Sequence, residues 1–420
     1  MRKILVALAI LVAAAVGFYL VMERKDTRER QEDSNRRLLT LDERAVSEVR
    51  ARVGEVEWVV IRDGEGTWSI EAPIRDPADS GAVMNLLRLM NQTEVMDTIE
   101  EPEQLSAYGL DPARAEIRVV GVSAPVLFIG SETPTRNGIF MRVEGRPGVL
   151  VGKAEMDSPF LNPDPSRLRE RTLTGMQMND IRRVSITESG DSVILEKDGE
   201  QWWITGPRRL PASQAVLTSL LEALGNAEVA GFIDEADPAE PRFRLGDTAL
   251  VVGLAGNSVE REIRLGAGTD AGVRFASRTG REAIMAVFGE RLFAIPQGVD
   301  AFLDSKLTKA NRYKVRWFRY ETDDGTLEVR RDPEREIWLA EDGREYADSD
   351  VFPMLVRLLE GRLLGWRQGS GPASQAASLE YEQEDGLKDR LVYGADGTVS
   401  LQSLPGVVFT ARVRLPELPG

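Results

Sequence analysis

Two short acidic stretches stand at matching places in the chain and could hold a hard cation. They are Glu100, Glu101 and Glu103, and, 134 residues further on, Asp234, Glu235 and Asp237. Calcium takes several oxygen ligands and accepts carboxylates readily. The spacing follows neither an EF-hand loop nor a nonapeptide calcium repeat, and Pro102 stiffens the first stretch. A solvated acidic loop is therefore the favoured interpretation, and we assign no metal-binding residue.

Tryptophans at recurrent positions could act as stacking platforms for a sugar ring. The candidates are Trp68, Trp202, Trp203 and Trp338. Packing of a strand aromatic against a neighbouring helix is the simpler account, so we expect Trp68 and Trp202 in the core. Successive side chains of a strand point to opposite faces, so Trp203 is the better surface candidate.

Two residue types on which much enzyme chemistry depends are absent, although an enzyme based on carboxylates or on lysine alone stays possible in principle. The chain contains no histidine and no cysteine, which excludes Ser-His-Asp and Cys-His catalysis, imidazole or thiolate zinc sites, iron–sulfur clusters and disulfides. Carboxylate pairs can always be found among 68 acidic residues, so their presence carries little information. Residues 253–256 follow neither a Walker nor a dinucleotide-binding pattern. We predict a non-enzymatic protein with no catalytic and no cofactor-binding residue.

The net charge further restricts the partners. At −15 for 420 residues, the chain would repel nucleic acid unless basic residues were strongly segregated, and the sequence contains no such basic patch. The absence of cysteine also excludes an acylated lipoprotein anchor. We expect no nucleic-acid partner.

An internal repeat of about 134 residues organises the chain. The first and second copies align without a gap over residues 68–99, and a third copy matches them less closely. Residues that recur are Trp68 as Trp202, Pro73 as Pro207, Glu94 as Glu228, and Ala78-Asp79-Ser80 as Ala347-Asp348-Ser349. The repeat predicts an N-terminal segment over residues 1–37 and modules over residues 38–172, 173–306 and 307–420, the last shorter and divergent.

Each copy is predicted to contain a β-hairpin. Asp63-Gly64 and Asp198-Gly199 suit tight hairpin turns because both central positions tolerate positive φ, whereas the third copy has Asp332-Pro333 there. The predicted strands are residues 56–61 and 67–71, 192–196 and 201–205, and 327–330 and 336–339.

An amphipathic helix is predicted after every hairpin, because apolar residues recur at i, i+3, i+4 and i+7. They are Val83, Leu86, Leu87 and Met90; Leu217, Leu220, Leu221 and Leu224; and Phe352, Leu355, Val356 and Leu359. Further alternating strands are predicted at residues 115–120, 126–129, 139–143 and 149–151, and at 249–254, 262–265, 273–276 and 283–287. The pattern predicts an α+β fold of three tandem, mainly antiparallel β modules with one packed helix each.

Residues 4–22 contain no charged side chain and follow Arg2 and Lys3. At ~1.5 Å per residue such a helix is ~28 Å long, which matches the hydrocarbon core of a bilayer. A cleaved signal peptide is the alternative, since Ala13-Ala14-Ala15 offers a cleavage site. Apolar residues continue to Met22, which favours an uncleaved, single-pass transmembrane anchor with a charged stalk before residue 38.

The charged residues that flank this anchor conflict with a periplasmic location of the large domain. The basic residues after it, Arg24, Lys25, Arg28, Arg30, Arg36 and Arg37, outnumber those before it and would place the large domain in the cytoplasm. Long domains translocate with less regard to such charges. We expect a bacterial inner-membrane protein with its C-terminal domain in the periplasm.

The chain resembles the bacterial DUF4340 family over most of residues 38–306. The resemblance rests on the anchor, the Asp-Gly hairpin with its following Trp and Pro, the Ala-Asp helix start, and Tyr108-Gly109-Leu110-Asp111-Pro112. In the second copy the Tyr-Gly-Leu-Asp-Pro element is eroded to Phe243-Arg244-Leu245-Gly246-Asp247, so its role need not be duplicated. The resemblance brings no catalytic residue. Family members are associated with gliding-motility-type ABC transport systems, which implies an accessory role in the envelope.

Two functions follow as expectations. In the first, the anchored modules form an accessory or scaffold component of an ABC-type transport system and contact its permease or another envelope component. In the alternative, they capture a polysaccharide, lipid or peptide in a cleft between modules and present it to a permease. A carboxylate-dependent hydrolase is the more remote third interpretation.

Overall fold

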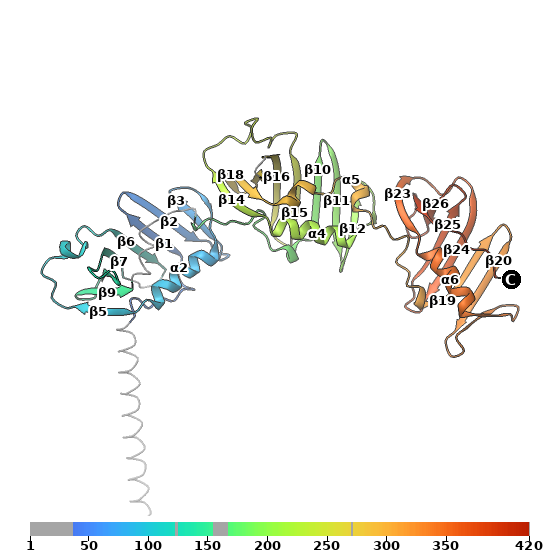
Figure 1. Ribbon diagram of the computed structural model, residues 1–420, viewed down its shortest axis with the longest axis horizontal. Coiled ribbons are helices and arrows are strands. Elements are labelled where there is room, and N and C mark those ends of the chain that lie inside the picture. Colours follow the sequence, from blue (N-terminus) through green and yellow to red (C-terminus); the bar gives the residue numbers. More distant parts are fainter. Residues whose placement is uncertain (1–36, 122–124, 154–166, 270–271, 420) are drawn as a thin grey trace, which may run out of the picture. The chain divides into compact units, whose positions relative to one another are not determined.

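The computed structural model describes residues 37–121, 125–153, 167–269 and 272–419 (Figure 1). They form two compact units, which divide between Arg171 and Thr172. Unit 1 contains one nine-stranded sheet, and unit 2 contains two. The three tandem antiparallel modules predicted from the repeat are therefore confirmed. The predicted anchor at residues 4–22 lies outside the described residues.

All strands of the first module pair antiparallel, in the order β4-β3-β2-β1-β6-β7-β8-β9-β5. The first four strands form a meander, the helix follows, and β5 then pairs at the far edge of the second meander. The elements are β1 (Glu48–Val53), β2 (Val56–Arg62), β3 (Trp68–Ala72), β4 (Asp76–Pro77), α2 (Ser80–Gln92), β5 (Val95–Ile99), β6 (Ala115–Val120), β7 (Leu127–Glu132), β8 (Gly138–Val143) and β9 (Val149–Lys153).

The second module repeats this order as β13-β12-β11-β10-β15-β16-β17-β18-β14. Its elements are β10 (Arg183–Glu188), β11 (Asp191–Asp198), β12 (Gln201–Gly206), β13 (Leu210–Pro211), α4 (Gln214–Gly225), β14 (Glu228–Ile233), β15 (Leu250–Ala255), β16 (Glu260–Gly268), β17 (Val273–Arg278) and β18 (Arg281–Phe288). A short helix, α5 (Gly298–Phe302), ends the module.

The third module also has the complete sheet, in the order β22-β21-β20-β19-β24-β25-β26-β27-β23. Its elements are β19 (Val315–Thr322), β20 (Gly325–Asp332), β21 (Ile337–Ala340), β22 (Glu345–Ala347), α6 (Asp348–Leu359), β23 (Arg362–Gln368), β24 (Gln375–Gln383), β25 (Lys388–Gly394), β26 (Thr398–Leu401) and β27 (Val407–Arg412). Its shorter length arises partly between β23 and β24, where residues 369–374 replace the longer connections of the other copies.

Each long helix lies against one face of its own sheet (Figure 1). Asp79 caps α2 by accepting hydrogen bonds from the N–H groups of Gly81 and Ala82, so the Ala-Asp helix start is confirmed. The helix residues that face the sheets are Val83, Leu86, Leu87 and Met90; Leu217, Leu220 and Leu224; and Val351, Met354, Leu355, Leu358 and Leu359. The packed helix therefore closes the core of each module.

The stripe predicted for the third helix is rotated. Phe352 and Val356 are only half-buried, whereas Val351 and Leu358 are fully buried. The same i, i+3, i+4, i+7 pattern can be read from Val351, one residue earlier, and that set faces the sheet. Phe352 instead packs at the margin against Tyr313, with 5.0 Å between the ring centroids.

The predicted hairpins are confirmed, but each copy begins one strand earlier. The additional strands are β1, β10 and β19, which lie at the centre of their sheets and join the two meanders. In the first module β1 pairs with β2 on one side and with β6 on the other.

Candidate functional site

The two acidic stretches lie directly after equivalent edge strands, β5 and β14. All six predicted carboxylate residues are exposed. Across the described ranges, no group of three or more acidic side chains is placed so that it could hold a metal ion. The geometry therefore does not bring these residues together into a cation site.

The tryptophans separate into core and surface. Trp68 is 1% exposed, Trp202 7% and Trp338 1%, so the expected core positions of Trp68 and Trp202 are confirmed. Trp338 donates its indole N–H to Asp348 Oδ1 at 2.9 Å, which fixes the start of α6. Trp203 is half-buried on the opposite face of β12, as the alternation of strand side chains predicts.

The Tyr-Gly-Leu-Asp-Pro element packs a loop of the first module against its sheet. Tyr108 meets Phe140 edge to face with 5.0 Å between the centroids, and Leu110 is buried. Gly109 has a φ of 66°, a left-handed conformation that glycine adopts without steric cost. The carbonyl of Tyr108 lies so close to Gly130 that a Cβ there would overlap it.

The eroded copy repeats this arrangement, so the packing role is duplicated although the sequence suggested that it need not be. Phe243 meets Phe275 edge to face at 5.1 Å, and its carbonyl lies against Gly266. Arg244 keeps the left-handed conformation with a φ of 51°, although it is not glycine. The element therefore clamps a loop onto its sheet in both copies.

A short connector joins the second and third modules within unit 2. The N–H of Asp304 donates to the carbonyl of Pro211 at 2.9 Å, and the N–H of Leu307 donates to that of Gly361 at 3.0 Å. Arg208 adds a bond from Nη2 to the carbonyl of Pro405, at 2.9 Å. Backbone bonds to both modules therefore hold the connector.

A pocket of about 310 Å³ lies at this connector, and we call it the junction pocket. Trp203 and Pro211 contribute from the second module and the remaining residues from the connector and third module. They are Asp304, Lys306, Leu307, Thr308, Lys309, Tyr381, Leu387, Lys388, Asp389, Leu401, Ser403 and Leu404. The surface aromatic singled out from the sequence thus lines an inter-module pocket.

Cations gather at the aromatic wall of the junction pocket. Lys309 Nζ lies 4.0 Å from the ring centroid of Trp203, and the guanidinium carbon of Arg209 lies 4.4 Å from it. Such cation–π contacts hold the indole in place. Partial removal from water lowers the pKa of Lys309, and nearby Asp304 partly offsets that effect.

Two polar side chains of the third module in the lining of the junction pocket, Tyr381 and Asp389, already have hydrogen-bond partners. Tyr381 Oη and Thr308 Oγ1 are 2.9 Å apart, and burial raises the pKa of Tyr381 to about 12. Asp389 accepts hydrogen bonds from Ser403 N at 3.0 Å and Ser403 Oγ at 2.6 Å. These bonds therefore occupy the polar groups of Tyr381 and Asp389 within the lining.

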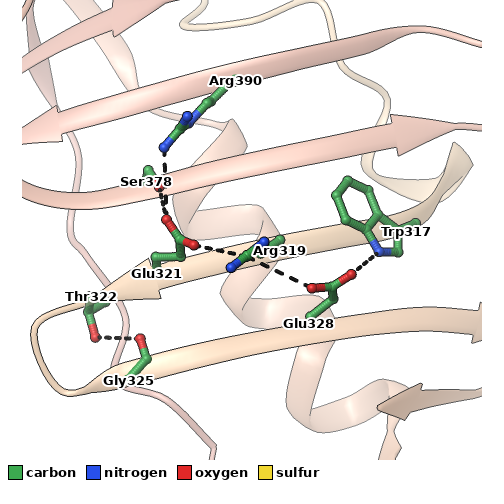
Figure 2. Close-up of polar contacts among 8 residues, drawn as sticks. All are labelled: Trp317, Arg319, Glu321, Thr322, Gly325, Glu328, Ser378 and Arg390. Carbon is green, nitrogen blue, oxygen red and sulfur yellow. Dashed lines mark hydrogen bonds and ion pairs between the residues drawn. The ribbon is translucent and has the colours of Figure 1, made fainter. Parts of the chain in front are cut away.

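The outer face of the third sheet carries a ladder of paired charges (Figure 2). Arg319 Nε lies 2.8 Å from Glu321 and 3.8 Å from Glu328. Glu321 also accepts from Ser378 Oγ at 3.1 Å, and Glu328 accepts the indole N–H of Trp317 at 3.2 Å. Exposed pairs of this kind contribute little stability, but they leave a face of mixed, locally balanced charge.

None of the helices in the described part of the chain is both long enough and apolar enough to cross a bilayer.

No curated protein matches the chain. Similar solved structures include the DNA polymerase III subunit beta from Pseudomonas aeruginosa, at 10% identity over 89% of this chain and 94% of that one, with a TM-score of 0.14. A putative DNA polymerase III beta subunit from Eubacterium rectale ATCC 33656 is similar at 8% identity over 90% and 93%, with a TM-score of 0.15.

A family model gives a specific result. The model for a domain of unknown function, DUF4340, matches residues 68–208 and again residues 202–376. The two matches begin at Trp68 in β3 and at Trp202 in β12, so they follow the period of the structural repeat. Because these matches span most of the chain, the protein belongs to the DUF4340 family.

Proposed function

We propose that this chain is a non-enzymatic, membrane-anchored envelope protein that serves as an accessory or scaffold component of an ABC-type transport system. The supporting observation is the triplicated module, in which a helix from the same copy fills the core of every sheet. Tandem copies of a closed module offer extended surface for contacts with other proteins. The resemblance to transport-associated members of the family supports the choice of partner.

The pairing of charges on the outer sheet face fits this role. A face of balanced charge such as the Arg319–Glu321–Glu328 ladder remains soluble and presents both signs to a partner. Affinity for a permease would then arise from a few central contacts, and the charged surroundings would contribute to orientation and specificity.

Purification of the native, full-length protein from membranes after mild cross-linking tests whether a transport component binds it. The proposal expects a permease or another transport component to co-purify in constant proportion. A protein that purifies with no membrane partner, at every cross-linker concentration, would count against the scaffold function.

The anchor and its topology belong to the same proposal. Residues 4–22 would form the single membrane span and place the modules in the periplasm. A fusion of alkaline phosphatase to the C-terminus should then be active, because that enzyme requires export. An inactive fusion with normal expression would place the modules in the cytoplasm and refute the topology.

The junction pocket favours ligand capture as a second candidate function. Lysine is uncommon in this chain, yet Lys306, Lys309 and Lys388 all line the pocket beside Trp203. Asp304 and Asp389 also line the pocket, so the three lysines leave an excess of one positive charge beside the aromatic ring, which suits an apolar ligand with an anionic group. The difference in fluorescence between the full chain and its Trp203→Phe variant, titrated with a fatty acid, tests this candidate. No ligand-dependent difference would remove it for that lipid class.

A further inference from the structure

The internal repeat allows one location to be compared in three copies of the same fold. In each module, the segment before the first strand passes the C-terminal end of the long helix. In the first module Asn91, in the last turn of α2, holds that segment. Leu41 N donates to Asn91 Oδ1 at 2.6 Å, and Asn91 Nδ2 donates to the carbonyl of Leu41 at 2.8 Å. The side-chain amide of Asn91 thus pairs with both the backbone N–H and the backbone carbonyl of Leu41.

An arginine from the second strand makes another tie at this location. Arg62 Nη1 donates to the carbonyl of Arg44 at 3.0 Å in the first module. In the third module Arg331 Nη1 donates to the carbonyl of Tyr313 at 3.3 Å, and Arg312 forms an ion pair with Glu360 at the helix end. The first and third copies therefore fasten the segment to the helix and the sheet.

The second module has replaced the residues that make both ties. Gly225 stands 134 residues after Asn91, so this position has no side-chain amide to bond the segment, and Met178 of the segment packs against the glycine instead. Lys197 occupies the position of Arg62 and directs its ammonium to Glu200 Oε2, at 3.3 Å. A pocket of about 710 Å³ lies beside Gly225, and we call it the module 2 pocket.

The lining of the module 2 pocket combines apolar side chains with neutral polar ones. Its apolar contributors are Met176, Met178, Ile181, Trp202 and Leu221. Its hydroxyl and amide contributors are Thr172, Thr174, Thr218, Gln177, Asn179 and Asn226. Lys197 and Glu222 add one charge of each sign, so no net charge selects an ionic ligand. Methionine side chains adapt their shape to apolar groups of different outline.

We propose that the module 2 pocket binds an extended, uncharged peptide segment of a partner protein, with one apolar side chain inserted between Met176, Met178 and Leu221. Asn226 and Gln177 would pair with the peptide backbone, as Asn91 pairs with Leu41 at the equivalent location of the first module. A second pocket of about 260 Å³ shares Met176 and Gln177, which gives an extended chain room to continue. The inference rests on the proposed function as an interaction protein and names the chemistry of the partner.

The test uses the full-length chain in detergent, labelled with ¹³C at its methionine methyl groups. The probe is the capped peptide acetyl-Gly-Ser-Leu-Ser-Gly-amide. The methyl signals of Met176 and Met178 should shift saturably, whereas those of the buried core residues Met285 and Met354 should not. The same peptide with serine in place of leucine should bind at least tenfold more weakly.

Two matched variants locate the binding. Thr218→Trp fills the pocket from an exposed helix position, whereas Ser219→Trp adds the same side chain at a neighbouring exposed position outside the lining. Affinity should fall at least tenfold in Thr218→Trp and persist in Ser219→Trp. Gly225→Asn, which restores the residue of the first module, should also weaken binding, with folding verified by circular dichroism.

Several outcomes would overturn the proposal. They are the absence of a saturable shift, equal affinity in both tryptophan variants, and saturable binding of maltotriose with none of the peptide. If a transport component still co-purifies with the chain, such a result removes only the peptide pocket. If no partner co-purifies either, the scaffold function fails independently.

Discussion

The buried ion pair of unit 1 gives a quantitative stability prediction. Asp76 Oδ2 and Arg169 Nε are 2.6 Å apart, and their side chains are 0% and 3% exposed. Removal of one partner leaves the other charge buried without this counter-charge, which costs about 3–5 kcal/mol. We therefore expect Asp76→Leu and Arg169→Leu each to destabilise unit 1 by that amount, a fall of ~10–15 °C in its melting temperature.

The repeat indicates how the loss can be recovered. Leu210 and Leu303 stand 134 residues after Asp76 and Arg169, and both belong to the hydrophobic core of unit 2. Replacement of both members of a buried ion pair by packed apolar residues is often neutral or stabilising. The double variant Asp76→Leu, Arg169→Leu should therefore melt well above either single variant.

Differential scanning calorimetry of the full-length chain is the assay, because the transition of unit 1 should move while that of unit 2 stays. Glu345→Leu is the control, since Glu345 lies on the corresponding strand of the third module, β22, and is half-exposed in a pair with Arg335. Single variants that shift the transition by less than ~3 °C, or a double variant as unstable as the sum of the singles, would refute the reasoning.

Three further predictions concern packing, ionisation and the helix end. Gly266→Ala should destabilise unit 2 by a few kcal/mol in urea, because the new Cβ would overlap the Phe243 carbonyl; an unchanged midpoint would contradict it. Burial raises the pKa of Tyr381 to about 12, above its value near 10 in the unfolded chain. The stability that this shift provides is present below pH 10 and lost towards pH 12, and Tyr381→Phe should flatten the loss measured by alkaline unfolding. Asn91→Gly should speed hydrogen exchange at the Leu41 amide, at a cost of about 1–2 kcal/mol; unchanged exchange would show that the tie is unimportant.

Local patterns predicted much of each module. Alternating apolar residues around an Asp-Gly turn locate β2 and β3 within two residues, because hairpin pairing is encoded by neighbouring residues. The spacing of Val83, Leu86, Leu87 and Met90 identifies the buried stripe of α2 for the same reason.

The features that the sequence did not predict depend on contacts between residues far apart in the chain. The strand β1 forms a local hairpin with β2, and it is also held by β6, with Glu48 opposite Val120, a distant pairing that no local pattern encodes. The module 2 pocket could not be predicted from the sequence, although one residue of the repeat marks its place. Gly225 breaks the repeat where Asn91 stands in the first copy, but the meaning of that change depends on which segment passes the helix end.

The edge strands were missed for a related reason. The strand β5 pairs with β9 more than fifty residues later, across the intervening meander, and its residues are largely exposed. Val95, Thr98 and Ile99 favour a strand, but the segment lacks the alternation of buried and exposed residues by which strands are recognised. Its pairing with a distant edge therefore could not be predicted from its own residues.

Hydrogen exchange over the three long helices tests the central claim most directly. If each copy is a closed module, the amides of α2, α4 and α6 exchange as slowly as those of the central strands β1, β10 and β19 in their own sheets. A helix that exchanges rapidly while its sheet stays protected would contradict the claim that this helix closes the core of its module.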